Sequence, residues 1–339
     1  MIAVGRYTSG RIAVANHSSW IESLELHRVE GSTFGELIEL SNALFLRGDL
    51  LGRIADHDRA ERVVHEAVAA SPDTARALYV RGRLAERFHR FQEAHALLDE
   101  ARTAGHPEHE IDSTRAALFQ ATGKYSAALV LREKLADYDR GIRTLGALAS
   151  LLAEVGQWSA AESCYAAAVD EDDHVSPLPC AQLLFELGLS AVRCGDLYCA
   201  EQLFVELDAI LPMHVPARGH RAEVALARGK LDIATELIAP LLELFDDPEY
   251  RATYAEILAA RGEREAAVSE AERAAATYEL LLARRPEAYA DHAAAFFMGV
   301  GKRPQRAIEL ASANWKLRDT PHSRSLLARA LRNANREAA

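Results

Sequence analysis

The sequence predicts an all-α solenoid built from about eight pairs of helices. Small residues recur in phase along most of the chain, a glycine-centred turn pattern follows them, and proline stands near the end of several units. The phased positions include Gly48, Gly82 and Ala116, which follow one another at intervals of 34 residues. Because a period of this length is typical of a two-helix repeat, repetition sets the expected architecture.

Each unit is expected to consist of a helix, a tight turn and a second helix. The turn follows the pattern Gly-x-(aromatic or Leu)-x-x-Ala, in which the glycine accepts the positive φ that ends the first helix. The apolar residue begins the second helix, and the alanine lets the two helix backbones approach closely. The pattern begins at Gly123, Gly156, Gly195 and Gly229, and it recurs at Gly262 with Arg264 in place of the apolar residue.

Bulky residues follow the alanine by one helical turn, where they are expected to fill the space between neighbouring units. Proline then ends the second helix, because it cannot continue the hydrogen-bond ladder. The bulky positions are Val64, Leu98, Tyr165 and Phe204, and the prolines are Pro72, Pro107, Pro212 and Pro248.

These phased residues resemble the tetratricopeptide repeat family over about residues 41–321. The family's small residue in the first helix matches Gly48, Gly82, Ala116, Ala149, Gly188, Ala222 and Ala255. Its alanine in the second helix matches Ala60, Ala94, Ala128, Ala161, Ala200, Ala234, Ala267 and Ala307. The resemblance implies a right-handed α-α superhelix with a C-terminal capping helix. It also implies a concave face, lined by the first helices, that holds a peptide or protein.

The repeats divide the chain into four expected parts. These are an N-terminal segment (residues 1–36), units 1–4 (37–175), units 5–8 (176–321), and a capping helix with a tail (322–339). The acidic stretch from Asp170 to Pro179 lengthens the spacing between units 4 and 5. In the N-terminal segment, weak alternation in Ile2–Tyr7 and Arg11–Ala15 allows a short hairpin or a loose tail, and Ser18–Glu22 predicts the start of a short helix.

Composition argues against several classes of protein. The chain has 339 residues, with 50 acidic and 39 basic residues and a net charge of −11, so its overall field does not favour nucleic acid. No apolar run has the length of a signal peptide or a membrane-spanning helix. Four cysteines in a chain of this length form no disulfide framework. We therefore expect a cytoplasmic protein without membrane insertion.

No pattern in the sequence indicates catalysis or a cofactor. Phosphate-binding loops, dinucleotide fingerprints, nucleophile elbows and His-Glu-x-x-His motifs are absent from it. The cysteines are Cys164, Cys180, Cys194 and Cys199. They lie near His174 without the Cys-x2-Cys spacing of a metal site, and Glu108-His109-Glu110 stands at a unit junction where exposed polar residues are ordinary. We expect no catalytic residue, metal or cofactor, and hence no enzyme.

The concave face of units 1 and 2 carries the main candidates for partner binding. The expected concave positions are Asn42, Phe45, Asp49, Arg53, Arg76, Tyr79, Arg83 and Arg87. Four arginines and two aromatics thus line one stretch of an acidic protein, and arginine can hold carboxylates bidentately. The alternative is that these arginines pair with acids such as Asp49 and Glu86 as a solvated face. Family members that clamp the acidic tail of a chaperone use Lys and Asn where Phe45 and Asp49 stand here.

Units 5 and 8 offer a more apolar lining for a partner. The candidates there are Phe185, Tyr289, His292 and Phe296. Such a lining suits an extended or helical peptide, and the chain's own N-terminal segment is the alternative occupant. We therefore predict a non-catalytic scaffold that binds a protein or peptide segment, acidic or C-terminal, in its concave groove. The alternative function is a ligand-sensing or accessory subunit of an enzyme or regulator encoded elsewhere. The sequence sets no oligomeric state.

Overall fold

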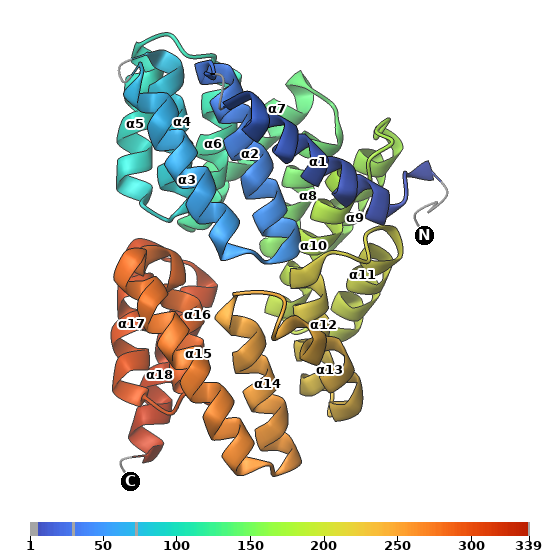
Figure 1. Cartoon of the computed structure of the whole chain (residues 1–339), viewed down its shortest axis with the longest axis vertical. Coiled ribbons are helices and arrows are strands. Elements are labelled where there is room, and N and C mark those ends of the chain that lie inside the picture. The colour runs from blue at the N-terminus through green and yellow to red at the C-terminus, as the bar shows by residue number, and fades with distance from the viewer. Residues whose placement is uncertain (1–5, 29–30, 72–73, 338–339) are drawn as a thin grey trace.

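The computed structural model describes residues 6–28, 31–71 and 74–337. Over these residues the chain forms eighteen α-helices and one short 3-10 helix, and it contains no strand. The predicted all-α class is confirmed. The helices wind into a solenoid whose last units return toward the first, so that α14–α18 lie beneath α2–α5 in Figure 1.

Eight helix pairs follow one another, and the two helices of each pair pack against each other. We number these pairs as units 1 to 8. The pairs are α2 (Phe34–Leu51) with α3 (Ile54–Ala69), α4 (Ala75–Arg87) with α5 (Phe91–Thr103), α6 (Glu108–Ala121) with α7 (Tyr125–Tyr138), α8 (Ile142–Glu154) with α9 (Trp158–Asp170), α10 (Leu178–Cys194) with α11 (Leu197–Ile210), α12 (Val215–Ala227) with α13 (Leu231–Ile238), α14 (Pro248–Arg261) with α15 (Arg264–Arg284), and α16 (Pro286–Met298) with α17 (Pro304–Leu317). The flanking elements are α1 (Gly10–Arg28), η2 (Ala239–Leu241) and α18 (Pro321–Glu337).

The small residues in phase allow the two helices of a pair to approach closely. A Cβ placed on Gly188 of α10 would lie 2.4 Å from a ring carbon of Phe204 in α11, so only glycine fits against this bulky neighbour. Ala94 and Ala128 are fully buried in α5 and α7, as their phase predicts. Gly195 ends α10 with φ of +80°, which an alanine would adopt only with strain. The sequence pattern therefore acts through close packing and through the turn.

Prolines stand between units in the positions where the second helix of one unit has ended. Pro107 precedes α6 directly, and Pro248 is the first residue of α14. Both positions suit proline, because the first turn of a helix needs no N–H donor at this residue. Pro72, which was also expected to close a unit, lies outside the described residues.

The expected N-terminal hairpin is wrong for the part that the structure describes. Residues Arg11–Ala15 and Ser18–Glu22 belong to one continuous helix, α1, and Ile2–Val4 lies outside the described residues. Ile21 and Leu24, three positions apart, are both buried, so α1 has a helical apolar face that the weak alternation obscured. The ring nitrogen Nε2 of His17 also lies 2.8 Å from the carbonyl oxygen of Ala43 in α2. The predicted short helix is therefore longer and begins earlier.

The solenoid returns to its first unit at the turn between α2 and α3. The ring of Tyr250 in α14 lies between Gly52 in this turn and Gly219 in α12, where added Cβ atoms would stand 2.3 and 2.9 Å from it. The Asp246 carboxylate accepts the backbone N–H groups of Ile54 (2.8 Å) and Ala55 (3.1 Å). Asp246 thus accepts hydrogen bonds from the free N–H groups at the N-terminus of α3. The side chain of Arg53, which directly precedes this helix, makes no capping hydrogen bond.

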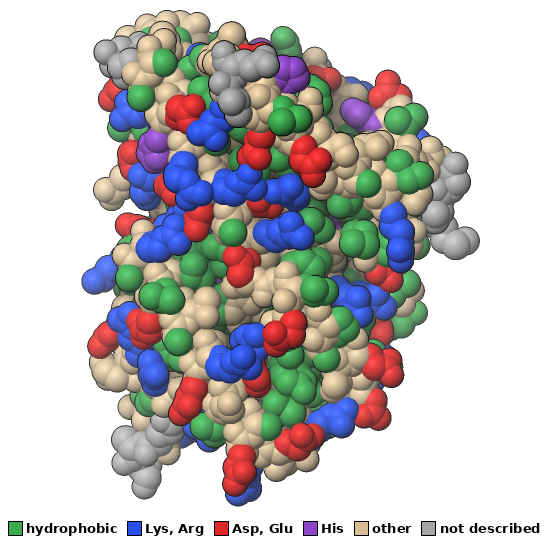
Figure 2. All heavy atoms as spheres, viewed as in Figure 1, with side chains coloured by type: hydrophobic (Ala, Val, Ile, Leu, Met, Phe, Trp, Pro, Cys, Tyr) green, Lys and Arg blue, Asp and Glu red, His purple; other side chains and the backbone are tan. Residues whose placement is uncertain are grey.

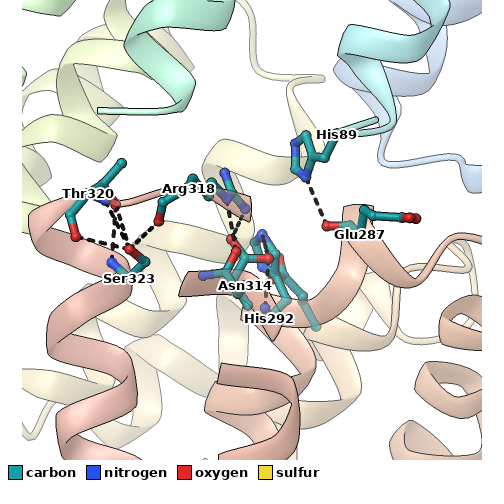
Figure 3. Close-up of polar contacts among 9 residues, drawn as sticks. His89, Glu287, His292, Asn314, Arg318, Thr320 and Ser323 are labelled. Carbon is teal, nitrogen blue, oxygen red and sulfur yellow. Dashed lines mark hydrogen bonds and ion pairs between the residues drawn. The ribbon is translucent and has the colours of Figure 1, made fainter. Parts of the chain in front are cut away.

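A second contact between the ends of the array joins α3 and α4 to the junction of α15 and α16. We call it the polar seam and define it by Asp58, Glu61, His89, Arg284 and Arg285. The Arg285 guanidinium pairs with Asp58 (2.9 Å) and with Glu61, and it lies 4.0 Å from the centre of the Phe88 ring. Arg284 pairs with Asp58 (2.8 Å), and the His89 ring contacts the carbonyl oxygen of Glu287 across the same junction (Figure 3).

The surface view in Figure 2 shows a band of Lys and Arg side chains across the middle of this face, close to where α3 approaches the last units. Arg28, Arg59 and Arg62 border a shallow surface hollow between α1 and α3, together with Glu25 and Glu66. Arg28 pairs with Glu66 and Arg59 pairs with Glu25, so two of these arginines are neutralised by side chains of the hollow.

The last helix follows unit 8 and ends the solenoid. Helix α18 caps the array as predicted. The Thr320 hydroxyl accepts the N–H of Ser323 (3.1 Å) and the Ser323 hydroxyl accepts the N–H of Thr320 (3.0 Å), so the helix start is capped on both sides. Within the described ranges, every helix is too short or too polar to cross a membrane.

Candidate functional site

Because the solenoid returns on itself, its concave side forms a half-open cavity of about 1190 Å³. The lining comes mainly from the first helices of units 3 to 8, namely α6, α8, α10, α12, α14 and α16, and α18 closes it on the C-terminal side. The concave face of the array is therefore the wall of this half-open cavity. Charged residues of both signs line this wall.

The acids on the wall have partners within the protein. Glu223 of α12 contacts the ring nitrogen Nδ1 of His220 (2.7 Å), and its second oxygen accepts the hydroxyl of Thr253 in α14 (3.3 Å). Burial opposes charge on His220, but the neighbouring Glu223 carboxylate outweighs this effect and raises the pKa of His220. Conversely, burial favours the neutral form of Glu223, and the His220 charge outweighs it, which lowers the pKa of Glu223. This pair therefore favours the ionised state of both groups.

A second group of paired acids stands where α16 meets the loop before α18. The Arg318 guanidinium donates to Asp291 (2.5 Å) and to the amide oxygen of Asn314 (2.9 Å). The His292 ring contacts Glu249 of α14. Figure 3 shows His292, Asn314 and Arg318 gathered at one place, with Thr320 and Ser323 beside them at the start of α18. These contacts hold the loop before α18 against α16.

The other acids of the wall accept hydrogen bonds from neighbouring side chains or have a raised pKa. Glu154 accepts the amide of Gln120 (2.9 Å) and the hydroxyl of Tyr125 (3.1 Å). Glu186 accepts the amide of Gln182 (3.0 Å). Burial, followed by the nearby Glu223 charge, raises the pKa of Glu256 above its usual range, so the neutral form of this carboxyl is favoured.

The arginines of the wall differ from the acids. Arg132, Arg193, Arg329 and Arg332 line the cavity, and among the residues that the structure describes none of them has a hydrogen bond or an ion pair. The Nε atom of Arg132 is buried without an acceptor. Arg193 lies close enough to His322 at the start of α18 for its charge, after burial, to lower the pKa of that imidazole. The cavity therefore offers guanidinium donors that no described group of the protein uses.

The residues predicted in units 1 and 2 fall into three situations. Asn42, Arg53, Arg76 and Arg83 are exposed. Tyr79 is buried: its ring stacks on His106 at 4.1 Å, so its expected place on an exposed groove is wrong. The reason is that His106, in the turn before α6, folds over the ring.

Phe45 and Arg87 are tied to one another and to Asp49. The Arg87 guanidinium pairs with the Asp49 carboxylate and lies 4.3 Å from the centre of the Phe45 ring. The alternative interpretation, in which an arginine of this face pairs with Asp49, therefore holds for Arg87. Arg76 and Arg83 instead lie over aromatic rings, those of Phe34 (5.3 Å) and Tyr79 (6.0 Å).

The residues predicted in units 5 and 8 do not form one surface. His292 and Phe296 line the cavity, but Phe296 is almost completely buried and its ring stacks on Tyr278 at 5.0 Å. Phe185 is half-buried against the ring of His214 (4.7 Å). Tyr289 lies beside Arg285 at the polar seam. Of these four, only His292 offers a polar group to the cavity.

The candidate metal ligands of the sequence remain apart. In the described part of the chain, one cluster has the spacing of metal ligands, formed by Asp172, Asp173 and His174. Its one buried member is already occupied, because Asp172 accepts the hydroxyl of Tyr7 (2.9 Å) and the backbone N–H of His174 (3.1 Å). The four cysteines are free thiols, and they do not belong to this cluster.

The sequence did not identify Arg132, Arg329 or Arg332 as candidates. Arg329 and Arg332 are three positions apart on α18, a spacing that places them on one helical face. That spacing was visible, but an exposed basic face is ordinary on a capping helix. The signal that distinguishes them is the return of the chain on itself, which turns this face toward α10 and α14.

Comparisons with known proteins agree with this architecture. Residues 45–108 and 147–209 match the family model described as tetratricopeptide repeat. A comparison with curated proteins gives no significant match. Among solved structures, a chain of the APC/C hetero-tetramer Cut9-Hcn1 is 17% identical, with a TM-score of 0.50 over 87% of this chain and 55% of that chain.

Two other solved structures are similar at lower TM-scores. A tetratricopeptide repeat protein from Parabacteroides merdae ATCC 43184 is 20% identical, with a TM-score of 0.47 over 72% of this chain and 93% of that chain. The C-terminal part of a TPR repeat-containing protein from Cytophaga hutchinsonii is 16% identical, with a TM-score of 0.41 over 74% of this chain and 99% of that chain. The matched stretches lie in both halves of the chain, and the helix pairs continue the same two-helix architecture through the rest of the described units.

Proposed function

We propose that this protein is a non-catalytic scaffold that binds a segment of another protein on the concave surface that lines this cavity. The observation that carries the proposal is the cavity of about 1190 Å³, whose wall consists of the first helices of six consecutive units. A volume of this size accommodates several residues of an extended chain, and it exceeds the usual range for a small-molecule pocket. Repeat proteins present extended concave surfaces to their partners.

The finer part of the proposal is that the bound segment is acidic or C-terminal. The charges of Arg87, Arg83 and Arg132 all act on the Glu86 carboxyl, whose pKa is nevertheless raised by burial. Since Arg132 lines the cavity, Arg83 and Arg87 of unit 2 lie near its N-terminal side. Within the proposal, Arg83 is available to a segment that leaves the cavity, whereas Arg87 is already paired with Asp49. We also assign the protein to the cytoplasm as part of this proposal.

The test is to fill the cavity without altering the charges of its wall. Ala117 and Ala295 line the cavity, and their replacement in the variant Ala117→Trp/Ala295→Trp narrows it. The matched control is Ala160→Trp/Ala266→Trp, at exposed positions of α9 and α15 that do not line the cavity. Each protein is used for affinity capture from native lysate, with quantitative mass spectrometry as the measurement.

We expect the filled variant to lose the proteins that both the wild type and the control capture. Equal capture by the filled variant and the control would contradict binding in the cavity. Circular dichroism melting must show that both variants keep their helices. If only a copurifying small molecule disappears in the filled variant, the ligand-sensing alternative replaces the scaffold.

A further inference from the structure

The wall of the cavity has an asymmetry that bears on what it binds. Its acids accept hydrogen bonds from neighbouring side chains or, like Glu256, favour the neutral form, as described above. Among its arginines, Arg318 pairs with Asp291, whereas four others form no hydrogen bond or ion pair with a described residue, namely Arg132, Arg193, Arg329 and Arg332. A guanidinium that lines the cavity without an acceptor from the protein is available for charge-assisted hydrogen bonds, which are about twice as strong as neutral ones. The missing partners are therefore acceptors, and the strongest acceptors for arginine are carboxylates and phosphates.

The arrangement of the four arginines favours a ligand with several acidic groups. They come from three separate elements, α7, α10 and α18, which surround the cavity. Arg329 acts on Glu256 of α14, and Arg193 acts on His322 of α18, so the charges face the interior from different sides. One carboxylate cannot reach donors on all three elements. A chain with successive acidic side chains can.

Resting on the proposed function, we propose that the cavity binds a carboxylate-rich segment of a partner protein through Arg132, Arg193, Arg329 and Arg332. The segment's side-chain carboxylates supply the acceptors that these guanidinium groups lack. The apolar part of the lining, which includes Leu189, contacts the methylene groups and backbone of the segment.

The net charge of −11 strengthens this assignment. A strongly acidic protein repels acidic chains at most of its surface, so an acidic segment is held only where positive charge is concentrated. Phosphate groups share this chemistry, and the probes below separate the two sources. The burial that lowers the pKa of Arg132 also removes competing water, which strengthens a contact with a carboxylate.

The experiment measures binding of a fluorescein-labelled octamer of glutamate by fluorescence anisotropy. The comparison probes are the matching glutamine octamer and inorganic tripolyphosphate as a competitor. The test variant is Arg329→Glu/Arg332→Glu, and Arg193→Gln is a milder variant at a separate element. The matched control is Arg143→Glu/Arg264→Glu, which reverses two exposed arginines that lie outside the cavity lining and also lack a partner among the described residues.

We expect the glutamate octamer to bind the wild type and the control, with at least tenfold weaker binding to Arg329→Glu/Arg332→Glu and a smaller loss for Arg193→Gln. Binding should also weaken as salt is raised. Equal binding of the glutamine octamer, or equal binding by the test and control variants, would overturn the proposal. Displacement by tripolyphosphate at far lower concentration than by unlabelled glutamate octamer would assign the site to a phosphate ligand instead.

The outcome is separable from that of the proposed function. If the cavity-filled variant loses its captured proteins while Arg329→Glu/Arg332→Glu retains them, the scaffold function stands and the carboxylate assignment is wrong. If neither variant loses them, binding lies outside the cavity. Loss in both variants, with the controls intact, supports both statements.

Discussion

The polar seam and the cavity wall are both rich in arginine, but they use it in opposite ways. At the seam, Arg285 is almost completely buried and meets two carboxylates, Asp58 and Glu61. On the wall, Arg329 and Arg332 are exposed and form no ion pair with a described carboxylate, although the charge of Arg329 acts on Glu256. The seam thus uses its arginine to hold two distant units together, whereas the wall keeps its arginines available for a ligand.

This difference shows why residue type alone does not separate structural from functional charge. Nothing in the sequence alone indicates that the roles of Arg87, Arg285 and Arg329 differ. Burial and pairing distinguish them, because a buried ion pair is costly to break while an unpaired exposed charge contributes little to stability.

The largest effect is expected at Arg285. The change Arg285→Ala leaves Asp58 and Glu61 without their shared cation in a buried place, so the free energy of unfolding should fall by about 3–5 kcal/mol. Urea unfolding followed by circular dichroism measures it. Arg284→Ala is the matched control, because Arg284 pairs with the same Asp58 but is half exposed, and it should cost under about 1 kcal/mol. Similar losses of unfolding free energy in the two variants would contradict the distinction between the buried Arg285 and the half-exposed Arg284.

A smaller effect is expected where Asp246 caps α3. Asp246→Ala removes the acceptor for the N–H groups of Ile54 and Ala55, which should cost about 1 kcal/mol. Hydrogen exchange at these two amides should become faster, since their acceptor is lost. Asp246→Asn retains an acceptor oxygen and should restore most of the protection. Unchanged exchange in Asp246→Ala would show that the cap does not form in solution.

Closure of the solenoid should also depend on pH through Asp247. Burial, followed by the neighbouring Asp246 carboxylate, raises the pKa of Asp247 to about 7. Because this pKa lies above its unfolded value, the contribution of Asp247 is complete at acidic pH and is lost as pH rises through about 7. We expect stability to fall between pH 5 and pH 8 by an amount on the order of 1 kcal/mol more in the wild type than in Asp247→Asn. The same pH dependence in both proteins would contradict this assignment.

The smallest effect is expected on the cavity wall. Arg329→Ala/Arg332→Ala removes two charges that have no partner in the described residues, so the free energy of unfolding should change by less than about 0.5 kcal/mol. Thermal melting at matched salt measures it. A loss above about 1 kcal/mol would place these arginines with Arg285 as structural residues. The comparison between seam and wall would then fail.

The sequence predicted the helix pairs, but it did not predict that the last units contact the first. Gly188 and Ala94 indicate the paired helices because close packing demands small residues at a fixed period, and this demand is local. The N-terminal helix was predicted too short because Ile21 and Leu24 give only a short apolar face. The burial of Tyr79 depends on a turn two helices away.

No local sequence pattern predicts the cavity. Whether unit 7 reaches unit 1 depends on the summed rotation between successive units, and each rotation is a small angle set by many side chains. Asp246 and Tyr250 carry no sequence signal of the closure, since an acid before a helix and a tyrosine within one are common. The candidate site moved from units 1 and 2 to the interior for this reason.

The closure also limits how the chain tolerates the gain or loss of a repeat. In an open array each unit contacts only its neighbours, so a unit is added or removed at the cost of one interface. Here Glu61 and Arg285 are 224 positions apart and still in contact, and Tyr250 fits between Gly52 and Gly219. Deleting one internal unit would draw these partners out of register, and inserting one would carry unit 8 past unit 1. The number of units is therefore part of the fold, in the way that the number of strands is part of a closed barrel.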